Sequence, residues 1–434
     1  MFAHQEVQDP AQKWDTQMRV RIVLPVFFVS IAASALAFSQ NFAFPQNFAH
    51  RPNLPPGATE AFAAFDDQTN GFVEAQADHV ADAMQFNEHE GLTGGLGPLY
   101  NADSCGSCHF NPVSGGISEV TELRAGHLDH HGIFVDAPGG SLINSAALPG
   151  VPMPYVPDRE FIRTFRTSLN ILGDGYVEAI ADDTLVQIAR SQSDKTRGRV
   201  SGRVIQVPLL EAPGQTRVAR FGWKNQHASL TSFSADAYVN EMGITTPVLP
   251  TERNSLGIDV SRFSQGSVPN NDGDDVDSFA RFLRATKAPP RDMAMAITPA
   301  AQDGARLFEA IGCGTCHVST IVTAPAGTMI NGGTLTVSDA LGNKIIHPFG
   351  DFLLHNVGTG DGIVQNGGPE TANELRTPPL WGLRMRNRLM HDGNSLTFED
   401  AVERHKNEAE DAADNFRRLG PRQRHALMVF LHSL

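Results

Sequence analysis

Two copies of one short pattern of cysteine and histidine constrain this chain more than any other feature. The sequence has four cysteines, and all of them fall in Cys-x-x-Cys-His runs at positions 105–109 and 313–317. Two thiols three positions apart can add to the two vinyl groups of one haem, and the histidine that follows then lies under the iron as proximal ligand. A four-cysteine zinc site or a redox dithiol would not explain a histidine after the second cysteine of both runs. The sequence therefore predicts two covalently bound haem c groups, held by Cys105, Cys108 and His109 and by Cys313, Cys316 and His317.

The overall charge of the chain is strongly negative. It has 34 basic and 48 acidic side chains, for a formal net charge of -14. Such a surface repels phosphate backbones and anionic membranes, which argues against a nucleic-acid partner. It suits a basic redox partner, such as a small cationic cytochrome.

An apolar run near the N-terminus predicts export. Residues 22–38 are almost entirely apolar, follow Arg19 and Arg21, and end with small residues around Ala37. This is typical of a signal peptide cleaved after Ala37, and a start at Met18 would give it the usual length. The alternative is a membrane anchor, but the run falls short of the roughly 20 apolar residues that a spanning helix needs. We therefore expect a periplasmic or otherwise exported protein with no stable membrane insertion after cleavage.

Helix signals predict a mainly α fold with two cytochrome c-like haem domains. Residues 274–285 carry an apolar face, and Thr298 and Pro299 begin a helix that leads into the second haem motif. The breaker at 288–290 between them predicts a domain boundary. The expected parts are a signal peptide over 1–37, an N-terminal haem domain over 38–290 and a C-terminal haem domain over 291–434. The N-terminal domain is larger than one haem requires, and its Gly- and Pro-rich stretch 111–213 predicts long loops and short strands.

Five further sets of residues accompany the haem motifs, at 95–105, 221–224, 347–351 with 353–358, 375–382 and 391–393. With these blocks the chain resembles the di-haem oxidoreductases grouped with peroxidases, from about Phe62 to the C-terminus. These proteins are distantly similar to bacterial di-haem cytochrome c peroxidases and to the di-haem enzyme that matures a tryptophylquinone cofactor.

The resemblance implies a second ligand for the C-terminal haem. In the peroxidases a His-Asp-Gly turn is followed fourteen residues later by the distal axial ligand, usually methionine, and counting from His391 leads to His405. A helix opened by Thr397 and Asp400 would carry His405 one turn after Ala401. The alternative is a surface histidine. Two imidazoles lower the iron potential relative to histidine with methionine, which argues against a plain cytochrome-fed peroxidase. His391 itself either handles protons at the haem edge or structures its turn.

The N-terminal haem has several candidate neighbours. The resemblance implies a distal histidine in the loop after the first motif, where His127, His130 and His131 lie. The alternative is that all three are solvated and that the iron is five-coordinate. Glu119 and Glu122, from the same region, are candidates to move protons at an open face.

Trp223 lies in block 221–224, one of those that carry the resemblance, which makes it a candidate to carry electrons between the haems. The alternative is that it packs in the core. Trp381 has only a packing role in this interpretation. His347 and His355 are expected to hydrogen-bond propionates or backbone rather than to bind iron. Calcium between the domains, present in the peroxidases, is not expected, because their Thr-x-Pro is replaced by residues 386–388.

Two functions follow from these patterns. The first is an oxidoreductase that reduces hydrogen peroxide or uses it to oxidise another substrate, with the N-terminal haem as reaction site and the C-terminal haem as electron relay. The second is a non-enzymatic electron carrier with both haems six-coordinate. An open coordination site distinguishes them.

Overall fold

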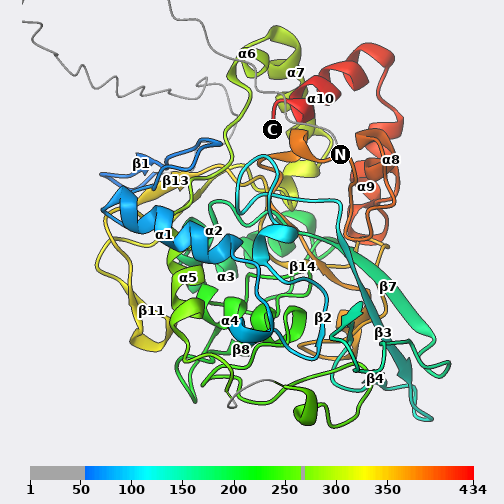
Figure 1. The fold of residues 1–434 in the computed structure, drawn as a ribbon. Coiled ribbons are helices and arrows are strands. Elements are labelled where there is room, and N and C mark those ends of the chain that lie inside the picture. The colour runs from blue at the N-terminus through cyan, green and yellow to red at the C-terminus, as the bar shows by residue number, and fades with distance from the viewer. Residues whose placement is uncertain (1–53, 265–268) are drawn as a thin grey trace, which may run out of the picture. The chain divides into compact units, whose positions relative to one another are not determined.

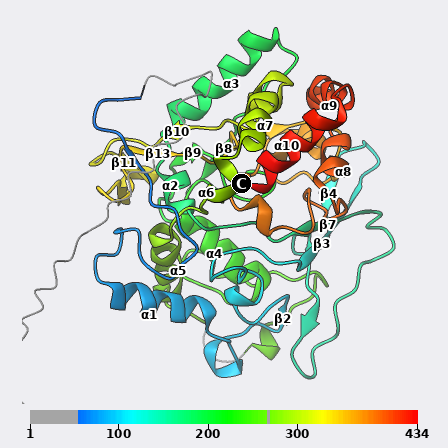
Figure 2. The same cartoon turned by 90° about the horizontal axis from the view of Figure 1, so that it is seen from above.

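The computed structural model describes residues 54–264 and 269–434, in which helices are the longest elements (Figures 1 and 2). The predicted signal peptide lies outside these residues. None of the described helices is long and apolar enough to cross a membrane. The α-helices are α1 (Gln76–Asn87), α2 (Asp174–Glu178), α3 (Asp182–Thr196), α4 (Leu230–Glu241), α5 (Asp274–Ala285), α6 (Met293–Ala296), α7 (Pro299–Ala310), α8 (Phe398–Glu403), α9 (Glu410–Arg417) and α10 (Pro421–His432).

The helices around the second haem motif begin where the sequence predicts. The Thr298 hydroxyl accepts a hydrogen bond from the Ala301 amide at 3.2 Å, and Pro299 occupies the first turn of α7. Helix α5 covers the predicted range, and its apolar face is buried. Helix α8 is capped by Thr397 but ends at Glu403. The prediction that His405 lies on this helix is therefore wrong, since His405 follows directly after the C-cap residue.

The strands are short, and most of them pair locally. The largest sheet is antiparallel, with β3 paired to β4, β5 and β7, and it is drawn at the lower right of Figure 1. The strands are β1 (Thr59–Glu60), β2 (Leu99–Tyr100), β3 (Thr121–Leu128), β4 (Phe134–Asp136), β5 (Leu142–Ile143), β6 (Ala146–Ala147), β7 (Ile162–Thr167), β8 (Gln206–Pro208), β9 (Thr216–Val218), β10 (Ile321–Val322), β11 (Met329–Ile330), β12 (Leu335–Thr336), β13 (Lys344–Ile346), β14 (Leu354–His355) and β15 (Leu375–Arg376).

The stretch 111–213 contains the predicted short strands but also two helices that the sequence analysis missed. Helix α3 is 15 residues long, and Leu185 is its one fully buried apolar side chain. Its apolar stripe is therefore too weak to indicate a helix by periodicity. Apart from this, the mainly α fold with added loops and short strands is confirmed.

Two hydrophobic clusters support the two haem motifs. The larger cluster combines α4 and α5 with residues from beyond position 290, including Ile321, Phe352 and Trp381. The second cluster joins α7 to α10 through Phe308 and Phe430, and these helices lie side by side in Figure 2. In addition, β1 pairs in parallel with β13. Contacts thus cross position 290 at several places, and the division into two domains at that position stays a prediction.

Candidate haem centres

The second haem motif borders a cavity of about 390 Å³ that the C-terminal helices enclose. Helix α7 ends at Ala310, and a short 3-10 turn, Cys313–Thr315, then exposes the cysteines to this space. Cys313, Cys316 and His317 all line it, together with His405. The lining therefore offers two thiols for attachment and two imidazoles for iron. This donor set fits a covalently held haem with histidine on both sides.

The hydrogen bonds of the two histidines leave one nitrogen of each free for iron. His317 Nδ1 lies 3.0 Å from the carbonyl oxygen of Phe349, to which it donates in the ligand tautomer. His405 Nδ1 lies 2.7 Å from the Ala401 carbonyl oxygen. Burial lowers the pKa of His317 to about 4, and burial also lowers the pKa of His405. Both imidazoles are thus neutral at pH 7, as metal ligation requires.

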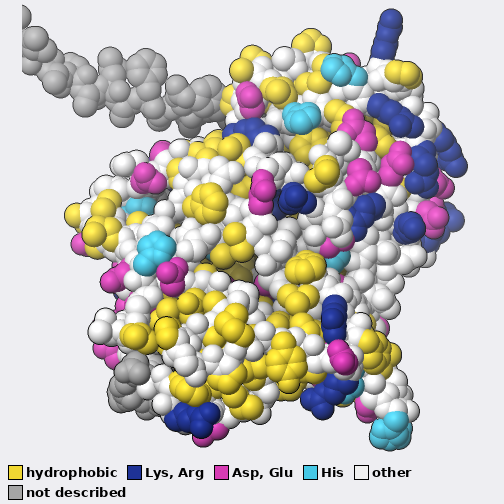
Figure 3. Space-filling view, turned by 45° about the vertical axis from the view of Figure 1, so that its right-hand side comes forward, with side chains coloured by type: hydrophobic (Ala, Val, Ile, Leu, Met, Phe, Trp, Pro, Cys, Tyr) yellow, Lys and Arg dark blue, Asp and Glu magenta, His cyan; other side chains and the backbone are white. Residues whose placement is uncertain are grey.

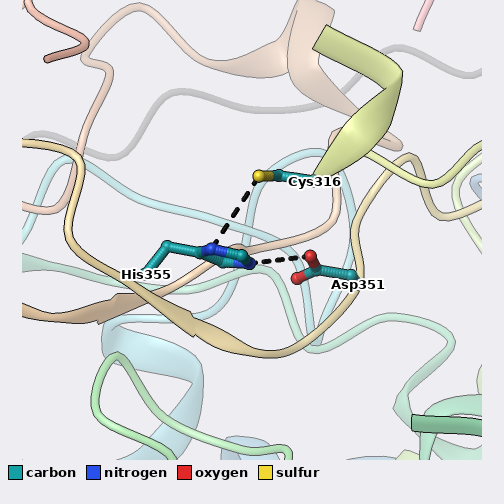
Figure 4. A group of neighbouring side chains, drawn as sticks. All are labelled: Cys316, Asp351 and His355. Atoms are coloured by element: carbon teal, nitrogen blue, oxygen red, sulfur yellow. Dashed lines mark hydrogen bonds and ion pairs between the residues drawn. The ribbon is translucent and has the colours of Figure 1, made fainter. Parts of the chain in front are cut away.

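His355 is held beside this haem site by two carboxylates. Its Nε2 lies 2.9 Å from Asp351 and its Nδ1 lies 3.0 Å from Glu408, while Cys316 Sγ is 3.9 Å from Nδ1 (Figure 4). Burial alone would lower the pKa of His355, but the Asp351 carboxylate and the Cys316 sulfur together outweigh burial and raise the pKa well above the ordinary value. We conclude that His355 is an imidazolium with both nitrogens occupied.

Cys316, Asp351 and His355 also have ligand atoms within 4.8 Å of one another, close enough for a metal ion. A sulfur joined to haem would no longer be a thiolate ligand, and both nitrogens of His355 already have carboxylate partners.

His347 does not belong to this group, and its Nε2 lies 3.1 Å from the Glu60 carboxylate. Asp351 and Glu408 were missed from sequence, because their importance depends on a fold that brings position 408 to position 355.

The first haem motif begins in another 3-10 turn, Cys105–Ser107, which is capped by the Ser104 hydroxyl. His109 Nδ1 lies 3.2 Å from the Gly116 carbonyl oxygen and 3.3 Å from Ser168 Oγ. Burial lowers the pKa of His109 to about 4. His109 is therefore a neutral imidazole whose other nitrogen is available to iron.

A pair of carboxyl groups lies near the cysteines of the first motif. Glu122, on β3, forms an ion pair with Arg124 through two bonds of 2.7 and 3.0 Å. Glu241, the last residue of α4, has its pKa raised to about 8 by burial and by the charge of Glu122. Burial, together with the carboxylates of Glu241 and Glu122, raises the pKa of the Cys108 thiol to about 12. Glu241 was missed from sequence, where it is one acidic residue at the end of a helix.

The other residues predicted for the N-terminal site lie apart from one another. Glu119 has a side chain that is 58% exposed, 4.0 Å from Arg388. His127 is on β3 and its Nδ1 lies 2.7 Å from Glu160. His130 and His131 are exposed in the turn between β3 and β4, with ring centroids 3.7 Å apart. Among the described residues, these histidines do not hydrogen-bond to or stack on residues 105–109, and their role as distal ligands stays a prediction.

Trp223 lies between the two candidate haem sites. Its ring lines the C-terminal cavity and packs edge-on against His391, with ring centroids 6.2 Å apart. Its Nε1 donates to the Thr167 carbonyl oxygen at 2.8 Å. The next residue, Ser168, contacts His109 as described above. A short path of bonded and hydrogen-bonded atoms thus joins the C-terminal cavity to the proximal histidine of the N-terminal site.

His391 and Arg386 complete the region between the sites. His391 is 4% exposed, and burial lowers its pKa to about 4. Arg386 lines the C-terminal cavity and donates to the Ser168 carbonyl oxygen at 3.1 Å. Trp381 is buried in the larger hydrophobic cluster, which agrees with a packing role.

Residues 156–434 match the family model described as "Di-haem oxidoreductase, putative peroxidase". The chain belongs to this family. This confirms the resemblance drawn from the sequence blocks, and membership of the family implies two haems and an oxidoreductase activity. No curated protein matches the chain.

The solved structures that are similar to the chain include three that share low sequence identity with it. A hydrazine synthase from Kuenenia stuttgartiensis is 16% identical, with 89% of this chain and 99% of that chain covered and a TM-score of 0.39. A MauG-like protein associated with microbial copper homeostasis is 13% identical, with 89% and 95% covered and a TM-score of 0.38. The diheme peroxidase BthA from Burkholderia thailandensis is 15% identical, with 88% and 94% covered and a TM-score of 0.40.

Proposed function

We propose that the protein is an exported di-haem c oxidoreductase that reduces hydrogen peroxide or uses it to oxidise another substrate. The haem on Cys105 and Cys108 is the reaction site, and the haem on Cys313 and Cys316 relays electrons. The observation that carries this proposal is the asymmetry of the two sites. In the C-terminal cavity two imidazoles, those of His317 and His405, each have Nδ1 hydrogen-bonded to a backbone carbonyl and Nε2 available to iron, whereas His109 and a carboxyl pair accompany the N-terminal cysteines.

The residues of the N-terminal site have the properties needed to move protons. Reduction of one hydrogen peroxide takes two electrons and two protons and forms two waters, and the haems supply the one-electron chemistry when they are bound. Glu241, with a pKa near 8, holds a proton at neutral pH that it can give to a peroxide oxygen. Arg124 keeps Glu122 in place beside it. Glu241 therefore replaces Glu119 as our preferred partner of Glu122.

The path through Trp223 suits electron transfer from the C-terminal haem to the reaction site. The indole contacts His391 on one side and the backbone before Ser168 on the other. Electrons would come from a redox protein, and the net charge of -14 favours a basic one, such as a small cytochrome. Acidic and basic side chains are interspersed on the face shown in Figure 3, so such docking would depend on the summed field.

The spectrum of the ferric protein tests this function. We expect a high-spin signal from the N-terminal haem, a low-spin signal from the C-terminal haem, and turnover of hydrogen peroxide with a reduced cytochrome. Two purely low-spin haems and no turnover would instead favour an electron carrier.

Covalent attachment is tested by denaturation. Because both motifs are complete, protein made with haem maturation factors should keep two haems per chain after unfolding in acid and organic solvent. Replacing both cysteines of one motif with serine should remove one haem, measured by the pyridine haemochrome spectrum. Release of both haems from the unchanged protein would contradict the proposed attachment.

Export is tested by the N-terminal sequence of the mature protein. We expect it to begin at Phe38 and to fractionate without detergent, because the apolar run before it has the features of a cleaved signal. Recovery of uncleaved residues 18–37 in membranes would show that the run is an anchor.

A further inference from the structure

A second, polar pocket of about 330 Å³ adjoins the C-terminal haem cavity. It is bordered by Arg163 of β7, by the loop 358–361, and by Arg404 and Lys406 just after α8. Thr359 and His391 line both this pocket and the haem cavity. The two spaces are therefore neighbours, separated by these side chains.

The charged side chains that line this pocket have a net positive charge. Asp392 is neutralised by Arg404, which binds it through two hydrogen bonds of 3.0 and 2.6 Å. Asp361 accepts from Lys224 at 2.8 Å and from Arg166 at 2.9 Å, and all three side chains are buried. Both carboxylates of the pocket thus already have cationic partners.

Two further cations have no carboxylate partner within the described part of the chain. The guanidinium of Arg163 donates only to backbone carbonyl oxygens, those of Glu160 at 2.8 Å and Pro157 at 3.3 Å. The ammonium group of Lys406 makes no hydrogen bond or ion pair with any described residue. Arg163 and Lys406 thus form a local positive site in a chain whose net charge is -14.

The pocket also presents hydrogen-bond donors without acceptors. In residues 54–264 and 269–434, no backbone or side-chain oxygen accepts from the amides of residues 359–361. Thr359 Oγ1 and His391 Nδ1 are buried polar atoms that also lack a partner. Buried polar groups left unpaired are costly, and successive free amides in a glycine-rich loop form anion-binding concavities.

The glycines keep the floor of this pocket lined by backbone. A Cβ at Gly358 would lie 2.6 Å from Lys406 Cβ, and a Cβ at Gly360 would lie 2.3 Å from Asn373 Cα. Gly358 also has φ of +79°, which side chains disfavour. The loop can therefore pack closely against residue 406 only with glycine at these positions.

We propose that this pocket binds an anionic oxygen group, a carboxylate or a small oxyanion, beside the C-terminal haem cavity. Lys406 and Arg163 supply the charge, and the loop 358–361 supplies the amide donors. The group comes either from a haem propionate or from a freely diffusing anion. This proposal depends on the binding geometry and not on peroxide turnover, so either can fail without the other.

The test is a titration of the ferric, haem-loaded protein with inorganic phosphate, followed by calorimetry. If the anion is free, phosphate binds, and Lys406→Ala and Arg163→Ala each raise the Kd about tenfold because a charge-assisted hydrogen bond is lost. Lys406→Arg should restore most of the affinity. Lys195→Ala, which removes an exposed lysine from α3, is the matched control and should leave the Kd unchanged.

The midpoint potential of the C-terminal haem shows whether the anion is a haem propionate rather than a freely diffusing one. If a propionate occupies the pocket, phosphate does not bind, but Lys406→Ala and Arg163→Ala lower the midpoint potential relative to Lys195→Ala, because a nearby positive charge stabilises the reduced haem. Haem content per chain confirms that the variants fold. Phosphate binding that the two variants leave unchanged, or no binding together with unchanged potentials, would overturn the proposal.

Discussion

Replacing Glu241 with glutamine is expected to lower the rate of peroxide reduction by about 10²- to 10⁴-fold, the usual range for a lost general acid or base. The amide keeps the size of the side chain but carries no transferable proton. Because the pKa of Glu241 is raised to about 8, its proton is present below that pH and is lost as the pH rises through it. The rate of the unchanged protein should therefore fall above about pH 8. Stopped-flow measurements of peroxide reduction across pH 6–9 check both effects.

Two further variants control this experiment. Glu74→Gln removes an exposed carboxylate far along the chain and should leave the rate and its pH dependence unchanged. Glu119→Gln tests the carboxylate chosen from sequence, and its rate of peroxide reduction is compared with that of Glu241→Gln. A Glu241→Gln protein with two haems, a normal rate and the same loss of activity above pH 8 would show that another group moves the proton.

The parts of the candidate sites that could be predicted from sequence are those with a local signature. Each Cys-x-x-Cys-His run places the proposed attachment and proximal ligand within five adjacent residues, so the positions can be identified from sequence. Helix α7 has a threonine cap and a first-turn proline, α10 has a first-turn proline, and α5 has an apolar face; all three helices begin where these signals lie. His405 was reached through a family spacing, and the structure brings it into one cavity with His317 although it does not lie on a helix.

The rest depends on contacts between distant positions, which no local pattern encodes. Glu241 acquires a raised pKa because it is buried at the end of α4 and because the charge of Glu122 acts on it. His355 lies between two carboxylates because positions 351 and 408 both reach it. The buried group of Arg166, Lys224 and Asp361 spans nearly 200 positions in the chain. Charged residues of this kind resemble surface residues in sequence, since burial alone changes their chemistry.

The contact of Trp223 with His391 is also a long-range result, and it changes how both residues are interpreted. Each had a structural alternative, core packing for the tryptophan and turn formation for the histidine. His391 Nδ1 has no hydrogen-bond partner among the described residues, whereas Asp392 is bound by Arg404. The turn is thus held by Asp392 and Arg404, which leaves His391 free to interact with a group bound in either adjoining cavity.

Replacing His405 with methionine is expected to raise the potential of the C-terminal haem by on the order of 100 mV, within the roughly 0.8 V that axial ligands span. The haem should stay attached, because Cys313 and Cys316 hold it independently. A thioether stabilises ferrous iron relative to a second imidazole, so the shift is upward, and the potential of the N-terminal haem should barely change. Spectroelectrochemical titration measures both. A replacement of exposed His425 with methionine is the matched control, since that side chain lies outside the cavity. If both potentials stayed at their original values, His405 would not bind iron, and the asymmetry between the two sites on which the relay role rests would be lost.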